Sequence, residues 1–212
     1  MNRAELMIEM RRSRLVAVVR SKSAEDALAL AQVAAEAGVK FVEITFSVPG
    51  AVDVIKSLAQ RPGIHVGAGT VLSKQQAEDA IRGGANFVVS PTLQLDLISL
   101  CHEANVACFP GAATPTEILT AARAGADLVK VFPADCVGGP YFIRQMSGPF
   151  PEIRFMVSGG VSFTNVREYV EAGVLGICLG SAYLGNLWAR NGRAEFIEEM
   201  TKFTKLVAAA QV

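Results

Sequence analysis

The chain repeats one pattern along its length: a helix-like stretch, a break at a small residue, and a short apolar run. The break is usually glycine, as at Gly38, Gly84, Gly125 and Gly173, which follow one another at intervals of 41 to 48 residues. Each interval therefore holds two units of roughly 20 to 24 residues, about the length of one strand and one helix. This repeat predicts an α/β fold in which strands and helices alternate.

The apolar runs are typical of parallel strands. They are rich in Val, Ile and Phe and do not alternate with polar residues, as expected for strands buried on both faces. Eight runs begin near residues 15, 39, 64, 86, 106, 128, 154 and 176, and helices are expected near 23–38, 51–60, 73–82, 94–104, 115–124, 140–146, 164–172 and 194–208. Eight such pairs predict a TIM (β/α)8 barrel with an extra N-terminal helix near residues 2–12. An open doubly wound sheet is the alternative, which the count of eight disfavours.

Composition limits the organisation and the partners of the chain. No linker or charge block interrupts it, so residues 1–212 are expected to form a single barrel domain. Lys+Arg 20 and Asp+Glu 20 balance, and no basic run occurs, which argues against nucleic acid as a partner. No apolar stretch approaches the ~20 residues that cross a bilayer, and the start lacks a leader pattern, so we expect a cytoplasmic protein without a membrane partner. A charged fraction of 19%, against a usual value of roughly 25%, favours an oligomer.

Cysteine and histidine spacing gives no sign of a metal site. The cysteines lie far apart without a CxxC pair, at Cys101, Cys108, Cys136 and Cys178. We expect buried free thiols rather than disulfides or zinc ligands. His65 and His102 have no ligand spacing either and are interpreted as structural. The sequence thus predicts neither a metal nor a cofactor.

Two charged residues stand inside predicted strands. Lys130 lies within LVKVF and Glu43 within KFVEITF, each flanked by apolar residues. Strand alternation puts Lys130 on the face of Leu128, and Glu43 on the face of Phe41. If both faces point into the barrel, an amine and a carboxylate share one small cavity. The alternatives are a buried ion pair that fills the barrel, or a lysine that points outward among the helices.

A lysine and a carboxylate in one cavity suit a defined chemistry. In a low-dielectric interior an amine loses its proton more readily and becomes a nucleophile. Its attack on a ketone gives a carbinolamine and then an iminium, an electron sink that lets a bond to the adjacent carbon break. The neighbouring carboxylate would carry protons. The pattern predicts class I aldolase chemistry with Lys130 as the nucleophile and Glu43 as the acid/base.

The ends of the predicted strands carry further candidate residues. Gly159 and Gly160 follow the seventh strand, and Gly180 and Ser181 follow the eighth. Their backbone amides and the serine hydroxyl predict a phosphate cradle, because loops after these two strands commonly hold phosphate in such barrels. Each glycine pair alone would more often be an ordinary turn.

Three other strand ends suit the wall of a site. Arg20 ends the first strand and is either a solvated loop residue or a clamp for a carboxylate. Thr70 and Pro91 end the third and fourth strands, where ordinary loop chemistry explains them equally well.

A resemblance to a known family rests on short segments that follow one another over nearly the whole chain. They are VAVVR, VEITFSVPGA, GAGTVL, VVSPTL, FPGAATPTE, LVKVFPA, GGPYFIRQMSGPFP, SGGVS and LGSAY. In this order the sequence resembles the bacterial 2-keto-3-deoxy-6-phosphogluconate (KDPG) aldolases, whose close relatives also cleave 4-hydroxy-2-oxoglutarate. The resemblance implies a Schiff-base Lys130, an acid/base Glu43, and a homotrimer. It also implies a pyruvate end lined by Thr70, Pro91 and Phe132, and a phosphate cradle at Gly159, Gly160, Gly180 and Ser181.

Two positions depart from the family pattern. One branch has an arginine four residues after the glutamate to hold the substrate carboxylate, where this chain has Ser47; another branch uses the arginine that ends the first strand, matching Arg20. Ser158 stands where many members have threonine, which keeps the hydroxyl. The resemblance implies reversible cleavage of KDPG to pyruvate and glyceraldehyde 3-phosphate. The alternatives are an aldolase for 4-hydroxy-2-oxoglutarate or the galactonate epimer, a phosphosugar isomerase or synthase without imine chemistry, and a non-catalytic phosphosugar-binding barrel.

Overall fold

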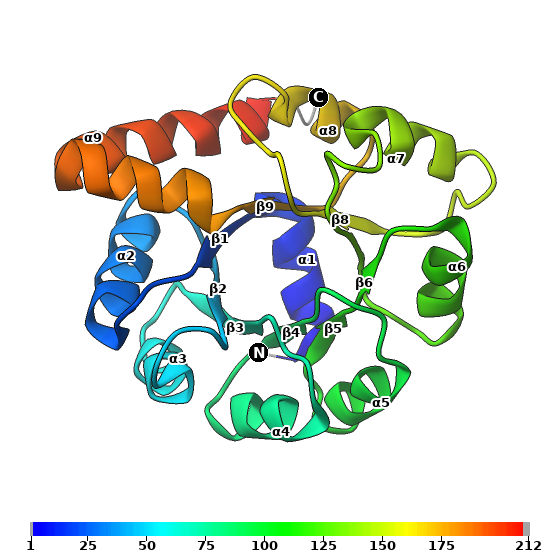
Figure 1. Ribbon diagram of the computed structural model, residues 1–212, viewed down its shortest axis with the longest axis horizontal. Coiled ribbons are helices and arrows are strands. Elements are labelled where there is room, and N and C mark those ends of the chain that lie inside the picture. The colour runs from blue at the N-terminus through cyan, green and yellow to red at the C-terminus, as the bar shows by residue number, and fades with distance from the viewer. Residues whose placement is uncertain (1, 210–212) are drawn as a thin grey trace.

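The computed structural model describes residues 2–209, apart from the side chains of residues 181, 182, 190 and 191. Its parallel strands form one sheet in the order β5-β4-β3-β2-β1-β9-β8-β7-β6, which curls into a ring (Figure 1). The strands are β1 (Leu15–Val19), β2 (Phe41–Thr45), β3 (His65–Gly69), β4 (Phe87–Val89), β5 (Ala107–Phe109), β6 (Gly111–Ala112), β7 (Val129–Val131), β8 (Phe155–Val157) and β9 (Gly176–Leu179).

The ring closes within one short stretch of chain, residues 107–112. β5 pairs with β4 on one side, and β6 pairs with β7 on the other. Pro110 separates the two segments because it has no N–H to donate to a sheet. Its carbonyl still accepts a hydrogen bond from the Lys130 backbone N–H at 2.9 Å. The predicted fifth strand is therefore divided in two, and the predicted TIM-type (β/α)8 arrangement is confirmed.

Helices surround the ring on its outer face (Figure 1). They are α2 (Ala24–Glu36), α3 (Ala51–Ala59), α4 (Lys74–Arg82), α5 (Leu95–Glu103), α6 (Pro115–Arg123), α7 (Gly139–Ser147), α8 (Val166–Glu171) and α9 (Ser181–Ala209). α9 begins well before the predicted residue 194 and kinks at Gly192, where φ is 69°. Gly185 and Gly192 weaken the helical pattern of its first half, so the sequence did not reveal it. None of the described helices has the length and apolar character needed to cross a membrane.

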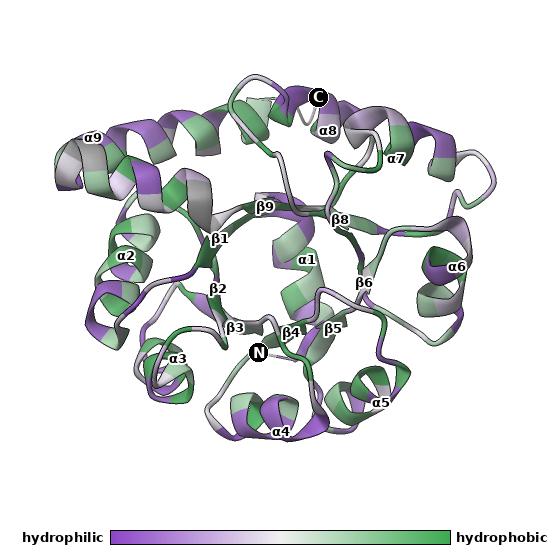
Figure 2. Ribbon diagram, in the orientation of Figure 1, coloured by the Kyte–Doolittle hydropathy of each residue, from purple (hydrophilic) through white to green (hydrophobic). Residues whose placement is uncertain are grey.

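The apolar residues divide into an outer layer, between strands and helices, and a cluster inside the ring. Figure 2 shows the strands as hydrophobic ribbon and much of the surrounding helical ribbon as hydrophilic. The cluster inside the ring consists of Leu6, Met10, Val16, Val18, Phe41, Phe87, Val89, Ala107, Phe109, Leu128, Met156 and Cys178. The strand members follow the period-2 alternation that points every second side chain inward.

The extra helix, α1 (Arg3–Ser13), covers the amino-terminal end of the ring and is seen through its centre in Figure 1. Asn2 and Glu5 form a capping box that starts the helix. Leu6 and Met10 enter the interior cluster, and Glu9 pairs with Lys40 at 2.9 Å just before β2. α1 is thus both a plug and a part of the core.

The cysteines and histidines play the following parts in the fold. All four cysteines are free. Cys101, Cys108 and Cys178 are buried, but the prediction of a buried Cys136 is wrong, because this residue lies in the exposed turn after β7. His102 contacts Asp127 at 3.0 Å, and the same carboxylate accepts the Cys108 backbone N–H at 2.9 Å, which ties α5 to two strands.

Candidate active site

Lys130 points into the barrel. It lies on β7 two residues after Leu128, a member of the interior cluster, and its side chain is 5% exposed. Its Nζ lies 5.3 Å from the centre of the Phe132 ring, which lies farther along on the same face. The alternative of a lysine pointing outward among the helices is therefore not what the structure has.

Glu43 points into the same space from β2. It is 1% exposed, and its neighbours in register are Val18 on β1 and Gly67 on β3. Its Oε1 lies against Gly69, where a Cβ atom would overlap the carboxylate. Gly69, the last residue of β3, therefore leaves room for the Glu43 side chain. Ordinary loop chemistry, the alternative for this segment, does not explain that contact.

The Glu43 carboxyl is buried near two positive charges without a complete set of hydrogen bonds. Its Oε2 is a buried oxygen without a hydrogen-bond partner, and no ion pair joins Glu43 to Lys130 within the part of the chain that the structure describes. Burial raises the pKa of the Glu43 carboxyl, while the positive charges of Lys130 and Arg20 lower it. A carboxyl whose pKa is raised by burial is a candidate for proton transfer.

Arg20 reaches the same end of the barrel from the end of β1. Its Nη1 donates to Ser47 Oγ at 2.6 Å and its Nη2 donates to Thr70 Oγ1 at 3.1 Å. Thr70 has a φ of 56°, which is unusual for a β-branched residue. The structure therefore joins Arg20 and Thr70, two residues selected from the sequence, through direct contact. Ser47 was noted only as a departure from a family pattern.

The loop after β8 lies beside the turn that follows β7. Gly159 and Gly160 have φ values of 99° and 66°, and a Cβ on Gly160 would overlap the Asp135 side chain. The Ser158 side chain is buried below them. Backbone close to backbone in a left-handed conformation explains why glycines stand here.

Gly180 joins β9 to α9. Its carbonyl accepts the N–H groups of Tyr183 and Leu184 at 3.0 and 3.1 Å, so it forms the first turn of the helix. A Cβ on Gly180 would meet no heavy atom of the described residues within 4 Å, so these residues leave the space beside it open. The predicted side chain of Ser181 lies outside the described residues.

Three more residues complete the surroundings. Pro91 is half-buried, and its backbone lies so close to Gly111 that a Cβ there would overlap it. Phe132 is half-buried beside Lys130. Cys178 faces the interior, where burial first, and then the charge of Glu43, raise the pKa of its thiol to about 12. Sequence reasoning did not connect Cys178 with the site; the signal that could have done so is its place two residues before Gly180, on the same face of the strand.

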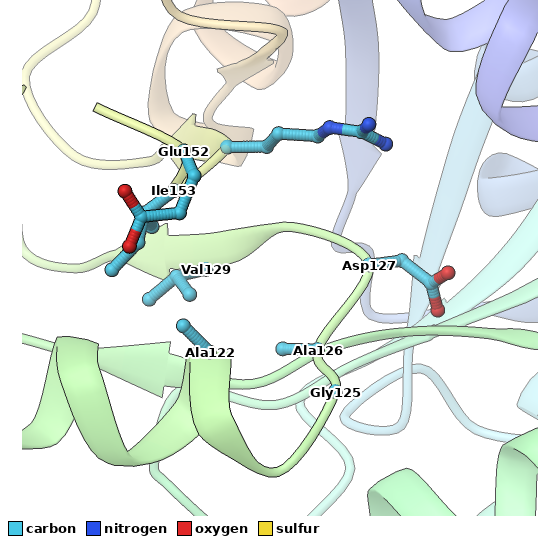
Figure 3. A pocket seen from close by; sticks show the side chains of 8 residues that line it. Ala122, Gly125, Ala126, Asp127, Val129, Glu152 and Ile153 are labelled. Carbon is cyan, nitrogen blue, oxygen red and sulfur yellow. The ribbon is translucent and has the colours of Figure 1, made fainter. Parts of the chain in front are cut away.

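A cavity of about 290 Å³ lies elsewhere, outside the ring (Figure 3). It lies between α6, β7 and the segment before β8, and its lining includes Ala122, Val129 and Glu152. Val129 precedes Lys130 and so faces the opposite side of the strand. The cavity contains none of the residues selected from the sequence, so the candidate active site remains the carboxyl-terminal end of the ring.

Comparison with known proteins gives consistent matches. A family model described as KDPG and KHG aldolase matches residues 6–200. The 2-dehydro-3-deoxy-phosphogluconate aldolase of Haemophilus influenzae is 34% identical over 196 residues, which cover 89% of this chain and 92% of that protein. The enzyme of the same name from Pseudomonas aeruginosa is 35% identical over 175 residues, covering 82% and 79%. A crystal structure of KDPG aldolase from Legionella pneumophila, with pyruvate captured as a covalent carbinolamine, has a TM-score of 0.78 and 28% identity, covering 97% and 98%.

Proposed function

Because this chain belongs to the KDPG and KHG aldolase family and is a carbon–carbon lyase, we propose that it cleaves KDPG through a Schiff base on Lys130. The products are pyruvate and glyceraldehyde 3-phosphate, and the reaction is reversible. The single observation that carries the proposal is the presence, inside one barrel, of the buried Lys130 and of the buried Glu43, whose Oε2 has no hydrogen-bond partner. The covalent carbinolamine in the Legionella pneumophila relative supports it.

The first half of the reaction joins the substrate to Lys130. The Nζ lone pair forms a bond to C2 of the substrate, and a proton passes from the nitrogen to the C2 oxygen to give a carbinolamine. Glu43 in its protonated form gives a proton to this hydroxyl, which leaves as water as the iminium forms. The burial that raises the pKa of Glu43 favours the protonated form that this step uses.

The second half breaks the bond between C3 and C4. The Glu43 carboxylate, which gave its proton in the first half, takes the proton of the C4 hydroxyl, the O–H electrons form the aldehyde carbonyl, and the C3–C4 pair flows into the iminium to give an enamine. Glu43 then protonates C3, and water adds to C2 to release pyruvate and the free amine. Because the iminium accepts the electron pair, this route needs no metal.

The remaining residues hold the two ends of the substrate. The Arg20 guanidinium and the Thr70 hydroxyl receive the carboxylate, and Pro91 and Phe132 line the pyruvate part. The phosphate lies on the amides of Gly159, Gly160 and Gly180, with Ser158 and Ser181 close to it. The left-handed glycines, the open space beside Gly180 and the start of α9 support this cradle.

Borohydride reduction in the presence of pyruvate tests the imine. The parent protein should gain the mass of one reduced pyruvate, located on Lys130 by peptide mapping, and Lys130→Ala should gain none. A parent protein that stays unmodified would favour the isomerase, synthase or binding-barrel alternatives. Pyruvate release from KDPG, its galactonate epimer and 4-hydroxy-2-oxoglutarate then ranks the substrates.

We also infer that the chain acts as a homotrimer in the cytoplasm. The low charged fraction of 19% supports burial of part of the surface, and Leu72, Leu95 and Tyr141 are large apolar side chains that stand exposed. Analytical ultracentrifugation should give the mass of three chains.

A further inference from the structure

A chain of hydroxyl groups leads from the β1 backbone to Arg20. Thr45 Oγ1 donates its only hydrogen to the Val19 carbonyl at 3.1 Å, and it lies 2.9 Å from Ser47 Oγ. Since the Thr45 hydrogen is used, Ser47 must donate to Thr45, and the Ser47 oxygen is left to accept from Arg20 Nη1 at 2.6 Å. Each hydrogen bond that links Val19, Thr45, Ser47 and Arg20 therefore has one defined donor and one defined acceptor.

The second amino group of Arg20 is fixed as well. Its Nη2 donates to Thr70 Oγ1 at 3.1 Å, which leaves the Thr70 hydroxyl hydrogen free to donate elsewhere. Thr70 holds an unfavourable positive φ, a conformation that persists where its surroundings determine it. Arg20 and Ser47 are nevertheless exposed, so a ligand can reach the guanidinium.

We propose that Ser47 is a positioning residue, which holds the Arg20 guanidinium in the orientation that receives the carboxylate of a 2-oxo acid. This inference rests on the proposed function. Arg20 has five N–H donors, of which two are used by Ser47 and Thr70, so three remain for the carboxylate. A neutral hydroxyl at position 47 orients the guanidinium without adding a second positive charge next to Arg20.

Steady-state kinetics on KDPG test the role. Ser47→Ala removes the acceptor, and Ser47→Cys keeps the size but accepts hydrogen bonds weakly. Both should raise KM about three- to tenfold, since a hydrogen bond to a charged group is lost, and should leave kcat within about twofold. Ser47→Thr should restore KM. Ser57→Ala, which removes a hydroxyl bonded to the α3 backbone, is the matched control and should behave as the parent protein.

A second readout separates carboxylate binding from general damage. Half-maximal borohydride trapping should need more pyruvate in Ser47→Ala than in the parent, while the concentration of methyl pyruvate, whose carboxylate is an ester, should not change. An unchanged requirement for pyruvate, or an equal increase for both ketones, would overturn the role of Ser47 alone. A parent protein that neither traps pyruvate nor releases it from KDPG would overturn the proposed function and the role of Ser47 together.

Discussion

The two ends of the barrel differ in how their charged side chains are partnered. At the amino-terminal end, Glu9 pairs with Lys40, and Leu6 of α1 fills the ring. Arg3 lies 3.6 Å from Asp127 there, so its charge is paired, although its Nη1 is buried without a hydrogen-bond partner. At the carboxyl-terminal end, Glu43 keeps an unpartnered buried oxygen close to Lys130. A buried charge without a partner destabilises a fold. One end of the ring is thus built for stability, and the other keeps groups ready for chemistry at a cost in stability.

The largest test of this contrast compares two lysines. Lys130→Ala should lower turnover of KDPG by at least about 10³-fold, because no nucleophile remains, with little change in the unfolding temperature. Lys40→Ala, which removes the lysine of the amino-terminal pair, should keep turnover within about twofold. Turnover is measured by pyruvate release, and the unfolding temperature by thermal denaturation. Equal losses of turnover in the two variants would show that the ends do not differ in function.

Two glycines on β3 sharpen the contrast. Gly69→Ala places a Cβ against the Glu43 carboxylate and should lower kcat by about 10²-fold, because the proton carrier is displaced. Gly67→Ala places its Cβ against the Phe87 ring in the interior cluster and should cost about 1 to 3 kcal/mol of stability. Gly185→Ala, where a Cβ meets no heavy atom of the described part of the chain within 4 Å, is the control for both. Matching kinetic losses in Gly67→Ala and Gly69→Ala would contradict a specific contact with Glu43.

The plug itself should matter for stability rather than chemistry. Leu6 is 1% exposed, so Leu6→Ala leaves a cavity in the interior cluster. We expect a loss of about 2 to 5 kcal/mol in the free energy of unfolding, measured by urea denaturation. Turnover at a temperature well below unfolding should stay near the parent value; a kcat that falls in step with stability would link the two ends.

The smallest effect is a pair of opposite pH dependences. Burial raises the pKa of Glu43 above 4.5, so its contribution to stability is present below about pH 4.5 and is lost as pH rises through the folded pKa. Hydrogen bonding to Lys40 lowers the pKa of Glu9, so its contribution is present above about pH 4.5 and is lost as pH falls through the folded pKa. At pH 8 Glu43→Gln should therefore unfold a few degrees above the parent protein, and Glu9→Gln slightly below it. Calorimetry at pH 8 and near pH 4 measures this; the same sign for both variants would contradict the charge difference between the ends.

Much of the fold and the main features of the candidate site could be predicted from local patterns. Strand alternation and apolar flanks depend on near neighbours in sequence, and they put Lys130 on the face of Leu128 and Glu43 on the face of Phe41. That these faces point inward, one of the alternatives left open by the sequence, is what the structure has. The division of the fifth strand into β5 and β6 at Pro110 was not predicted, because a proline in a strand removes one hydrogen-bond donor without changing the apolar pattern.

The missed details depend on contacts between distant parts of the chain. Ser47 reaches an arginine 27 residues away, and nothing near Ser47 in sequence indicates that partner. Gly69 is needed by the Glu43 side chain on the neighbouring strand rather than by its own backbone. Cys136 looked like other small apolar residues, but the turn after β7 leaves it at the surface.

Since α1 covers the amino-terminal end of the ring, the substrate enters and the products leave through the carboxyl-terminal end. In the proposed reaction the half-molecule bonded to Lys130 stays deepest, and the aldehyde lies between it and the solvent. The aldehyde must therefore depart first and pyruvate last, so that pyruvate alone competes with the incoming sugar acid for the empty enzyme.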